Sequence, residues 1–74
     1  MEKNIFLIGT RKITSKKNNK DYFMVDYVRE GTPKTDYISE LEFTNIRNKN
    51  KNMKEVTGIF NINLYDKAYL CDVK

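Results

Sequence analysis

Apolar and polar residues alternate along most of this chain with a period of two, which predicts β-strands rather than long helices. The alternation predicts five strands, over residues 4–14, 21–30, 35–43, 55–65 and 66–74. Gly9 lies in the middle of the first strand. A glycine there predicts a β-bulge or a sharp bend, which small barrels need where one strand serves two parts of the sheet.

The first two predicted strands form a long hairpin. The two asparagines of "SKKNNK" between them favour a tight turn, because asparagine tolerates positive φ. One face of the second strand carries Phe23, Val25 and Tyr27, and the opposite face carries Tyr22, Met24, Asp26 and Val28. Tyr22 and Tyr27 therefore cannot both enter the core, and Tyr22 lies close to the tip of the hairpin.

The middle of the chain is less regular. "GTPK" (31–34) predicts a turn, and the strand predicted over 35–43 has Tyr37, Leu41 and Phe43 on one face and an acidic opposite face. Segment 44–54, "TNIRNKNKNMK", is either a loop or a short, poor helix. The loop is favoured, because four asparagines disfavour a helix.

The late strands complete the predicted architecture. The strand over 55–65 places Phe60, Ile62 and Leu64 inward, and a tight turn at Tyr65-Asp66-Lys67 leads into the last strand. Five short strands with a long first hairpin predict an all-β chain folded as a small OB-fold-like Greek-key barrel. An SH3-like barrel is the structural alternative.

The 74 residues predict a single domain, 1–74, with a small core and marginal stability. Cys71 is the only cysteine, so the monomer has no disulfide, and a cytosolic location is expected. Without histidine, the commonest general base and metal ligand is absent. We therefore expect neither an enzyme nor a metal or other cofactor. The apolar run "NIFLIGT" is far too short for a membrane span, and no membrane partner is expected.

The net charge of +4 is unevenly distributed. Segments 11–20 and 44–54 hold nine of the fourteen basic residues and no acid, whereas the rest of the chain holds five basic and ten acidic residues. Such segregation favours a polyanionic partner. The alternative is that these lysine-rich segments are only well-solvated loops.

Binding of single-stranded nucleic acid requires cations for the phosphates and aromatic rings that stack on bases. Nine aromatic residues are present, five of them tyrosines. The candidate nucleic-acid-binding residues are Arg11, Lys12, Lys16, Lys17, Lys20, Tyr22, Tyr27, Tyr37, Arg47, Lys49 and Lys51, with Lys54 also in the second basic segment. Phe6, Phe43 and Phe60 are expected in the core. Lysine is a point charge suited to phosphate rather than to base edges, so low sequence specificity is expected.

Two motifs carry a family resemblance. "SKKNNKDYF" resembles the basic DNA-binding wing, and "TGIFNINL" resembles a late strand, of the small single-stranded DNA-binding proteins of filamentous phages and mobile elements. The resemblance implies that Lys16, Lys17 and Lys20 bind phosphates and that Tyr22 stacks on a base. It also implies a homodimer that coats DNA cooperatively, with a role in phage DNA replication.

These observations predict a protein that coats single-stranded DNA with low sequence specificity, with RNA as a possible ligand. The alternative is a phage or mobile-element interaction module, an adaptor or inhibitor that docks an acidic protein through its basic loops. A purely structural subunit is the third hypothesis. The pairing of tyrosines with lysines favours the first, because docking to an acidic protein gains less from aromatic rings.

Overall fold

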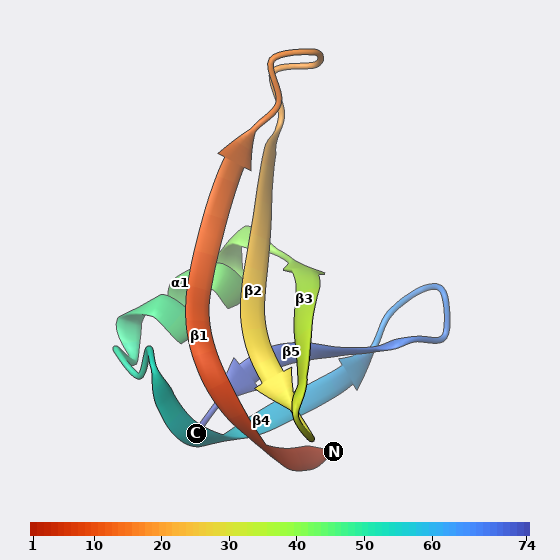
Figure 1. Cartoon of the computed structure of the whole chain (residues 1–74). Coiled ribbons are helices and arrows are strands. Elements are labelled where there is room, and N and C mark those ends of the chain that lie inside the picture. Colours follow the sequence, from red (N-terminus) through yellow and green to blue (C-terminus); the bar gives the residue numbers. More distant parts are fainter.

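The computed structural model describes residues 1–74, and its five strands form one antiparallel sheet that curls into a partly open barrel (Figure 1). Along the chain the elements are β1 (Glu2–Thr14), β2 (Asp21–Arg29), β3 (Thr32–Ile38), α1 (Glu40–Asn48), β4 (Lys54–Ile62) and β5 (Ala68–Val73). The strand order in the sheet is β3-β2-β1-β4-β5. The predicted fold class, a mainly β, OB-fold-like barrel with a long basic first hairpin, is confirmed.

β1 belongs to both halves of the barrel. Its first part, Glu2 to Leu7, pairs with β4, and its longer second part, Phe6 to Thr14, pairs with β2. The register of β1 against β2 shifts between Leu7 and Gly9, which is the predicted bulge. A bulge bends the strand and increases its twist, and this allows β1 to cross from one half to the other.

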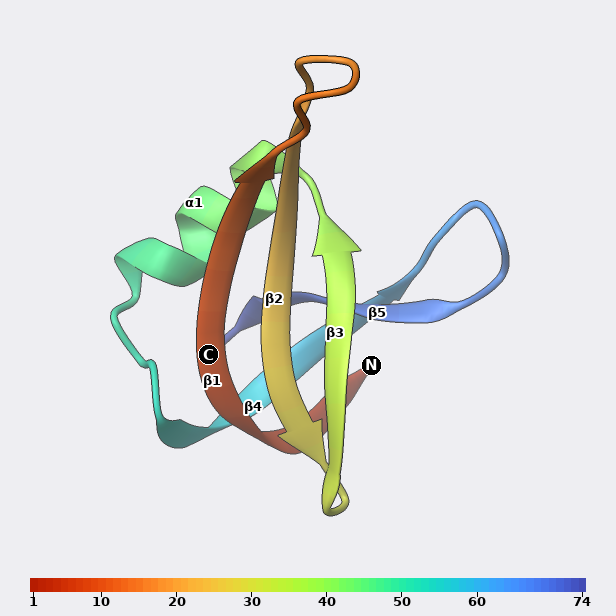
Figure 2. The ribbon, with the colours of Figure 1, turned by 45° about the horizontal axis from the view of Figure 1, so that its top comes forward.

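The core lies between the two halves of the curled sheet. Leu7, Val25, Ile46, Leu70 and Val73 are fully buried there, and Ile5, Tyr27 and Phe60 surround them. α1 packs against β1, β2 and β5, and Figure 2 shows it behind β1 and β2. Its buried residues, Phe43 and Ile46, complete one side of the core.

The predictions for residues 35–54 require correction. β3 ends at Ile38, and α1 occupies Glu40–Asn48, so Leu41 and Phe43 are helical and the favoured loop begins only after Asn48. The cause is a capping box: the Ser39 hydroxyl accepts from the Glu42 amide at 3.1 Å, and the Glu42 carboxylate accepts from the Ser39 amide at 2.9 Å. These bonds satisfy backbone donors at the helix start, which outweighs the poor helix propensity of the asparagines.

The predicted inward positions of the fourth strand also need correction. Phe60 is buried, but Ile62 is half exposed and Leu64 is fully exposed. β4 ends at Ile62, and a turn over residues 63–67 precedes β5. In this turn the Asn63 carboxamide accepts from the amides of Tyr65 and Lys67. The turn projects beyond the barrel, so continued alternation no longer places side chains in the core.

The side chain of Asp36 joins the two outermost strands of the sheet. β3 and β5 lie side by side but share no backbone pairing. One oxygen, Oδ2 of Asp36, accepts from the Leu70 amide at 2.9 Å and from the Tyr27 hydroxyl at 2.6 Å. The carboxylate thus takes the place of a backbone acceptor at the open seam of the barrel.

A second polar contact fixes α1 to β5. The Tyr69 hydroxyl donates to the Glu42 carboxylate at 2.8 Å, through the oxygen that the capping box does not use. This hydrogen bond, together with burial, raises the pKa of Tyr69 to about 12. Glu42 therefore both starts the helix and positions it against the sheet.

We expect Gly58→Ala to destabilise the protein by about 1–3 kcal/mol, because it overpacks the core. An added Cβ at Gly58 would lie 2.7 Å from Leu70 Cδ1 and 3.1 Å from Ile5 Cδ1, and both side chains are buried. Gly9→Ala is the matched control, since its nearest contact would be the Asn52 side chain at 3.4 Å. Urea denaturation followed by circular dichroism measures both variants. Equal stability of the two variants would contradict the packing argument.

Candidate nucleic-acid interface

The tip of the β1-β2 hairpin, residues 15–20, is a hydrogen-bonded turn that projects beyond the barrel (Figure 1). The Asn19 amide donates to the Ser15 carbonyl at 2.9 Å, and Asn19 adopts the positive φ of 57° that its side chain tolerates. The Asn18 carboxamide accepts from the Lys20 amide. Lys16, Lys17 and Lys20 are exposed and take part in no ion pair. Their charges are thus available to an anion.

Two exposed tyrosines lie beside each other where this hairpin meets the barrel. Tyr22 of β2 and Tyr37 of β3 are 39% and 70% exposed, and their ring centroids lie 6.3 Å apart at an interplanar angle of 70°. The Tyr22 hydroxyl accepts a hydrogen bond from the Asn18 carboxamide at 3.2 Å. This contact links the ring of Tyr22 to the basic tip. The predicted site residues Tyr22, Tyr37, Lys16, Lys17 and Lys20 therefore belong to one end of the molecule.

The two tyrosines border a cavity of about 470 Å³, which we call the aromatic pocket. It is lined by Asp21, Tyr22, Phe23, Tyr37, Ile38, Ser39 and Glu40. Its walls come from the start of β2, the end of β3 and the beginning of α1. The pocket thus lies where β3 ends at Ile38 and α1 begins at Glu40.

Tyr27 is placed differently from the prediction. Its side chain is only 3% exposed, its ring packs 5.8 Å from that of Phe60, and its hydroxyl donates to Asp36. Burial and this hydrogen bond raise the pKa of Tyr27 well above its ordinary value. Tyr27 is a core residue, so its assignment to the nucleic-acid interface is corrected.

Arg11 and Lys12 already have acidic partners. The Arg11 guanidinium contacts both oxygens of Asp26, at 2.6 and 3.0 Å, and Thr35 donates to the same carboxylate. Burial by itself raises the pKa of Asp26, but the hydrogen bonds from Arg11 and Thr35 outweigh it, and the pKa lies below its ordinary value. Lys12 lies 3.6 Å from Asp21 and 5.9 Å from the centre of the Phe23 ring. Both cations are thus partly neutralised.

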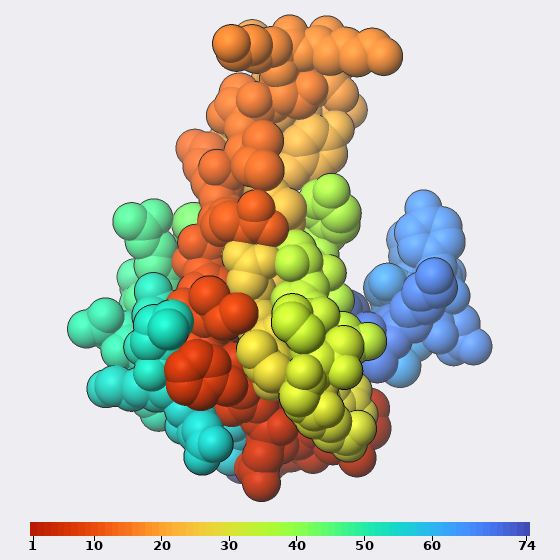
Figure 3. Space-filling model, in the orientation of Figure 1, coloured from red at the N-terminus to blue at the C-terminus, as the bar shows by residue number.

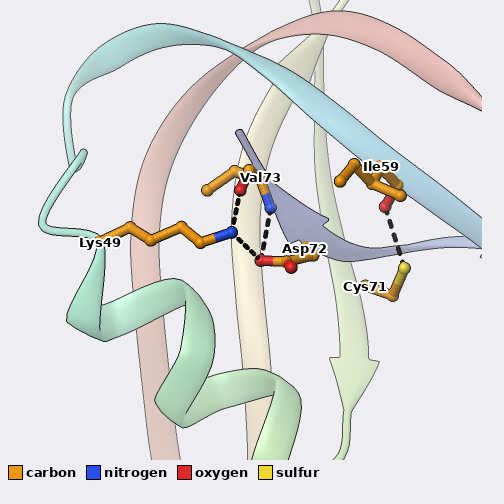
Figure 4. A network of polar contacts seen from close by, with 5 residues as sticks. All are labelled: Lys49, Ile59, Cys71, Asp72 and Val73. Carbon is orange, nitrogen blue, oxygen red and sulfur yellow. Dashed lines mark hydrogen bonds and ion pairs between the residues drawn. The ribbon is translucent and has the colours of Figure 1, made fainter.

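The basic residues of the second segment have different surroundings. Lys49 donates to Asp72 at 2.8 Å and to the Val73 carbonyl, which ties the end of α1 to the end of β5 (Figure 4). The Arg47 guanidinium lies 5.7 Å from the centre of the Phe43 ring. The ammonium group of Lys49 is therefore partly neutralised, and it holds the C-terminal strand. Cys71, in the same view, donates to the Ile59 carbonyl at 3.2 Å, and burial raises the pKa of its thiol.

Lys51 and Lys54 line another cavity, of about 810 Å³, together with Glu30 and Glu55. This cavity includes Asn4 at the start of β1, whereas the basic tip follows Thr14 at its end. Lys51 and Lys54 therefore lie near the other end of β1 from the tip lysines. Arg47 lies nearer to the first basic segment, because the Phe43 ring that it covers packs 5.0 Å from the Phe23 ring, over which Lys12 lies.

The sequence did not single out three features of the exposed surface. Asn18 orients Tyr22, Glu40 borders the aromatic pocket, and Tyr65 is largely exposed on the 63–67 turn. Figure 3 shows this turn standing clear of β3, while the basic tip rises above the barrel. Only the capping signature Ser-x-x-Glu at 39–42 could have indicated that Glu40 lies in the first turn of a helix.

Comparison of the chain with protein-family models, with curated proteins and with solved structures finds no match. No group of three or more His, Cys, Asp or Glu side chains is placed to hold a metal ion. The only helix, α1, has nine residues and is not long and apolar enough to cross a membrane. The tip and the aromatic pocket are therefore the features from which a function is inferred.

Proposed function

We propose that this chain is a single-stranded DNA-binding protein of low sequence specificity. One observation carries the proposal: two exposed, adjacent tyrosines lie at the base of a hairpin tip that bears three unpaired lysines and no acid. In an unpaired strand the bases and the phosphates are both accessible. Aromatic rings can therefore stack on the bases while neighbouring cations bind the phosphates.

In this proposal the lysines and the tyrosines bind different parts of the strand. Lys16, Lys17 and Lys20 contact phosphates as point charges, which supplies affinity without reading the sequence. Tyr22 and Tyr37 stack on bases, and every base has a face that a ring can cover. The angle of 70° between the rings prevents them from stacking on each other, so the more exposed Tyr37 keeps a face open to a base.

The position of these residues agrees with the fold. OB-folds bind oligonucleotides on the face of β2 and β3, between the β1-β2 and β4-β5 loops. Here the β1-β2 loop carries the lysines and the β4-β5 loop carries Tyr65. This support is an analogy between folds, and the tyrosine and lysine geometry carries the proposal itself.

Self-association is part of the proposal. The 63–67 turn and the end of β4 expose Ile62, Leu64 and Tyr65, three apolar or aromatic side chains without a partner in the monomer. A domain of this size gains stability when such groups are covered. A homodimer that coats the strand is consistent with this exposure.

Fluorescence anisotropy with labelled oligo(dT), oligo(U), duplex DNA and an acidic peptide, at two salt concentrations, tests the proposed function. We expect oligo(dT) to bind more tightly than duplex DNA of equal length, because stacking on Tyr22 and Tyr37 requires unpaired bases. Equal or tighter binding of the duplex would reduce the interface to charge alone. Tight binding of the acidic peptide without binding of oligo(dT) would favour the interaction module instead.

A further inference from the structure

The aromatic pocket contains one carboxylate that has neither a hydrogen-bond partner nor an ion-pair partner in the protein. Asp21 accepts from the Thr14 hydroxyl at 2.7 Å and lies 3.6 Å from the Lys12 ammonium. The Ser39 hydroxyl oxygen accepts from the Glu42 amide in the helix cap. Glu40, by contrast, is exposed and has neither a hydrogen bond nor an ion pair. It is the free acceptor beside two exposed aromatic rings.

A carboxylate in this position would favour some bases over others. Cytosine presents an exocyclic amino group, which donates to a carboxylate. Uracil has a carbonyl oxygen at that position, which repels a carboxylate, and its only N–H of the pairing edge lies between two carbonyl oxygens. The negative charge of Glu40 also repels phosphate, so the edge of a base rather than the backbone is the part of the strand that the pocket admits.

We propose that the aromatic pocket holds one base stacked on Tyr37, and that Glu40 accepts a hydrogen bond from the exocyclic amino group of that base. The pocket therefore prefers cytosine to uracil at one nucleotide of the bound strand. The inference rests on the proposed function and adds a local base preference to it. The phosphates on either side of this nucleotide remain bound by the tip lysines without regard to sequence.

Oligo(dC) and oligo(dU) of about eight nucleotides are the test ligands, a length within the range covered by one OB-fold. The two bases are equal in size, and neither carries the methyl group of thymine. We expect wild-type protein to bind oligo(dC) about fivefold more tightly, which is near the lower end for discrimination by a carboxylate or similar group. The measurement is anisotropy at neutral pH and fixed salt.

Glu40→Gln should reduce the oligo(dC) to oligo(dU) affinity ratio to about twofold or less, because the glutamine amide both donates and accepts. Glu40→Asp should also reduce it, since the charge is kept but the shorter side chain withdraws the acceptor. Glu55→Gln is the matched control, because Glu55 is exposed and has no ion pair. It is also far from the pocket. Glu55 pairs with Phe6 of β1, and Phe6 lies roughly 24 Å along that strand from Ile13, the residue that pairs with Tyr22. Glu55→Gln should change both affinities equally and leave their ratio near fivefold.

Each outcome separates the two proposals. Equal binding of oligo(dC) and oligo(dU) by wild-type protein, or a ratio that persists in Glu40→Gln, overturns the base preference and leaves the proposed function intact. Failure to bind any oligonucleotide overturns both. If wild-type protein instead binds a lysine-rich peptide and Glu40→Gln abolishes that binding, the pocket receives a cationic side chain and not a base.

Discussion

Replacing Asp36 by alanine is expected to lower the free energy of unfolding by about 2–4 kcal/mol, the largest effect of any single polar substitution in this barrel. The change removes the acceptor of the Leu70 amide and of the Tyr27 hydroxyl at once. Leu70 and Tyr27 are both buried, so water does not readily replace the missing acceptor. β3 and β5 share no backbone pairing that would hold the seam in its absence.

Urea denaturation measures this effect, and amide hydrogen exchange at Leu70 reports on the seam itself. Tyr27→Phe separates the two hydrogen bonds, because it removes the hydroxyl and leaves the bond from Leu70 to Asp36. It should therefore cost less than Asp36→Ala. The control Glu55→Ala removes an exposed carboxylate without a partner and should change stability by about 0.5 kcal/mol or less. A similarly small change in Asp36→Ala would show that the seam holds without this side chain.

Replacing Tyr37 and replacing the tip lysines should weaken binding of single-stranded DNA in two different ways. Tyr37→Ala should cost about 1–3 kcal/mol of binding free energy and leave the salt dependence unchanged, because stacking releases few counterions. Lys16→Ala with Lys17→Ala should flatten the slope of log affinity against log salt, by about 0.7 for each phosphate that is no longer neutralised by a lysine. Titration of oligo(dT) at four salt concentrations distinguishes the two effects.

Tyr37 is a cleaner probe of stacking than Tyr22. Its ring is 70% exposed, and no hydrogen bond holds its hydroxyl, whereas Tyr22 also binds Asn18 of the tip. Tyr37→Phe is the matched control, because it keeps the ring and should bind as wild type does. Thermal melts of all variants should coincide closely. Wild-type affinity in Tyr37→Ala would remove the stacking role of Tyr37, and stacking would then depend on Tyr22 alone.

The sequence misplaced the third strand for a definable reason. Over residues 37–43 the apolar positions are few. The alternation of Tyr37, Leu41 and Phe43 fits a strand, whereas Phe43 and Ile46, three residues apart, fit one face of a short helix. The capping box at Ser39 and Glu42 decides between them locally, and α1 then gains stability by burying Phe43 and Ile46 against the sheet. The aromatic pocket follows from this helix, so a strand over these residues did not predict it.

The charge pattern along the sequence predicted the free cations of the tip better than it predicted the state of the second basic segment. Segment 11–20 contains no acid, and its tip lysines remain without ion pairs after folding. Lys49 appeared equivalent by sequence, but Asp72 and Val73 are 23 and 24 residues away along the chain. Only the packing of α1 on β5 brings these groups together, and this gives the ammonium group of Lys49 an acidic partner.

The sequence by itself determined the elements that depend on local chemistry. These are the alternation of β1 and β2, the bulge at Gly9, and the asparagine turn that carries the lysines, since each follows from the steric and hydrogen-bonding preferences of neighbouring residues. The tertiary structure alone decided which tyrosine of β2 enters the core. Alternation places Tyr22 and Tyr27 on opposite faces, but burial of Tyr27 requires Phe60 and Asp36. Met24, on the same face as Tyr22, is buried, whereas Tyr22, two residues nearer the hairpin tip, is 39% exposed. Burial depends on contacts between distant segments, and a pattern along one strand cannot supply them.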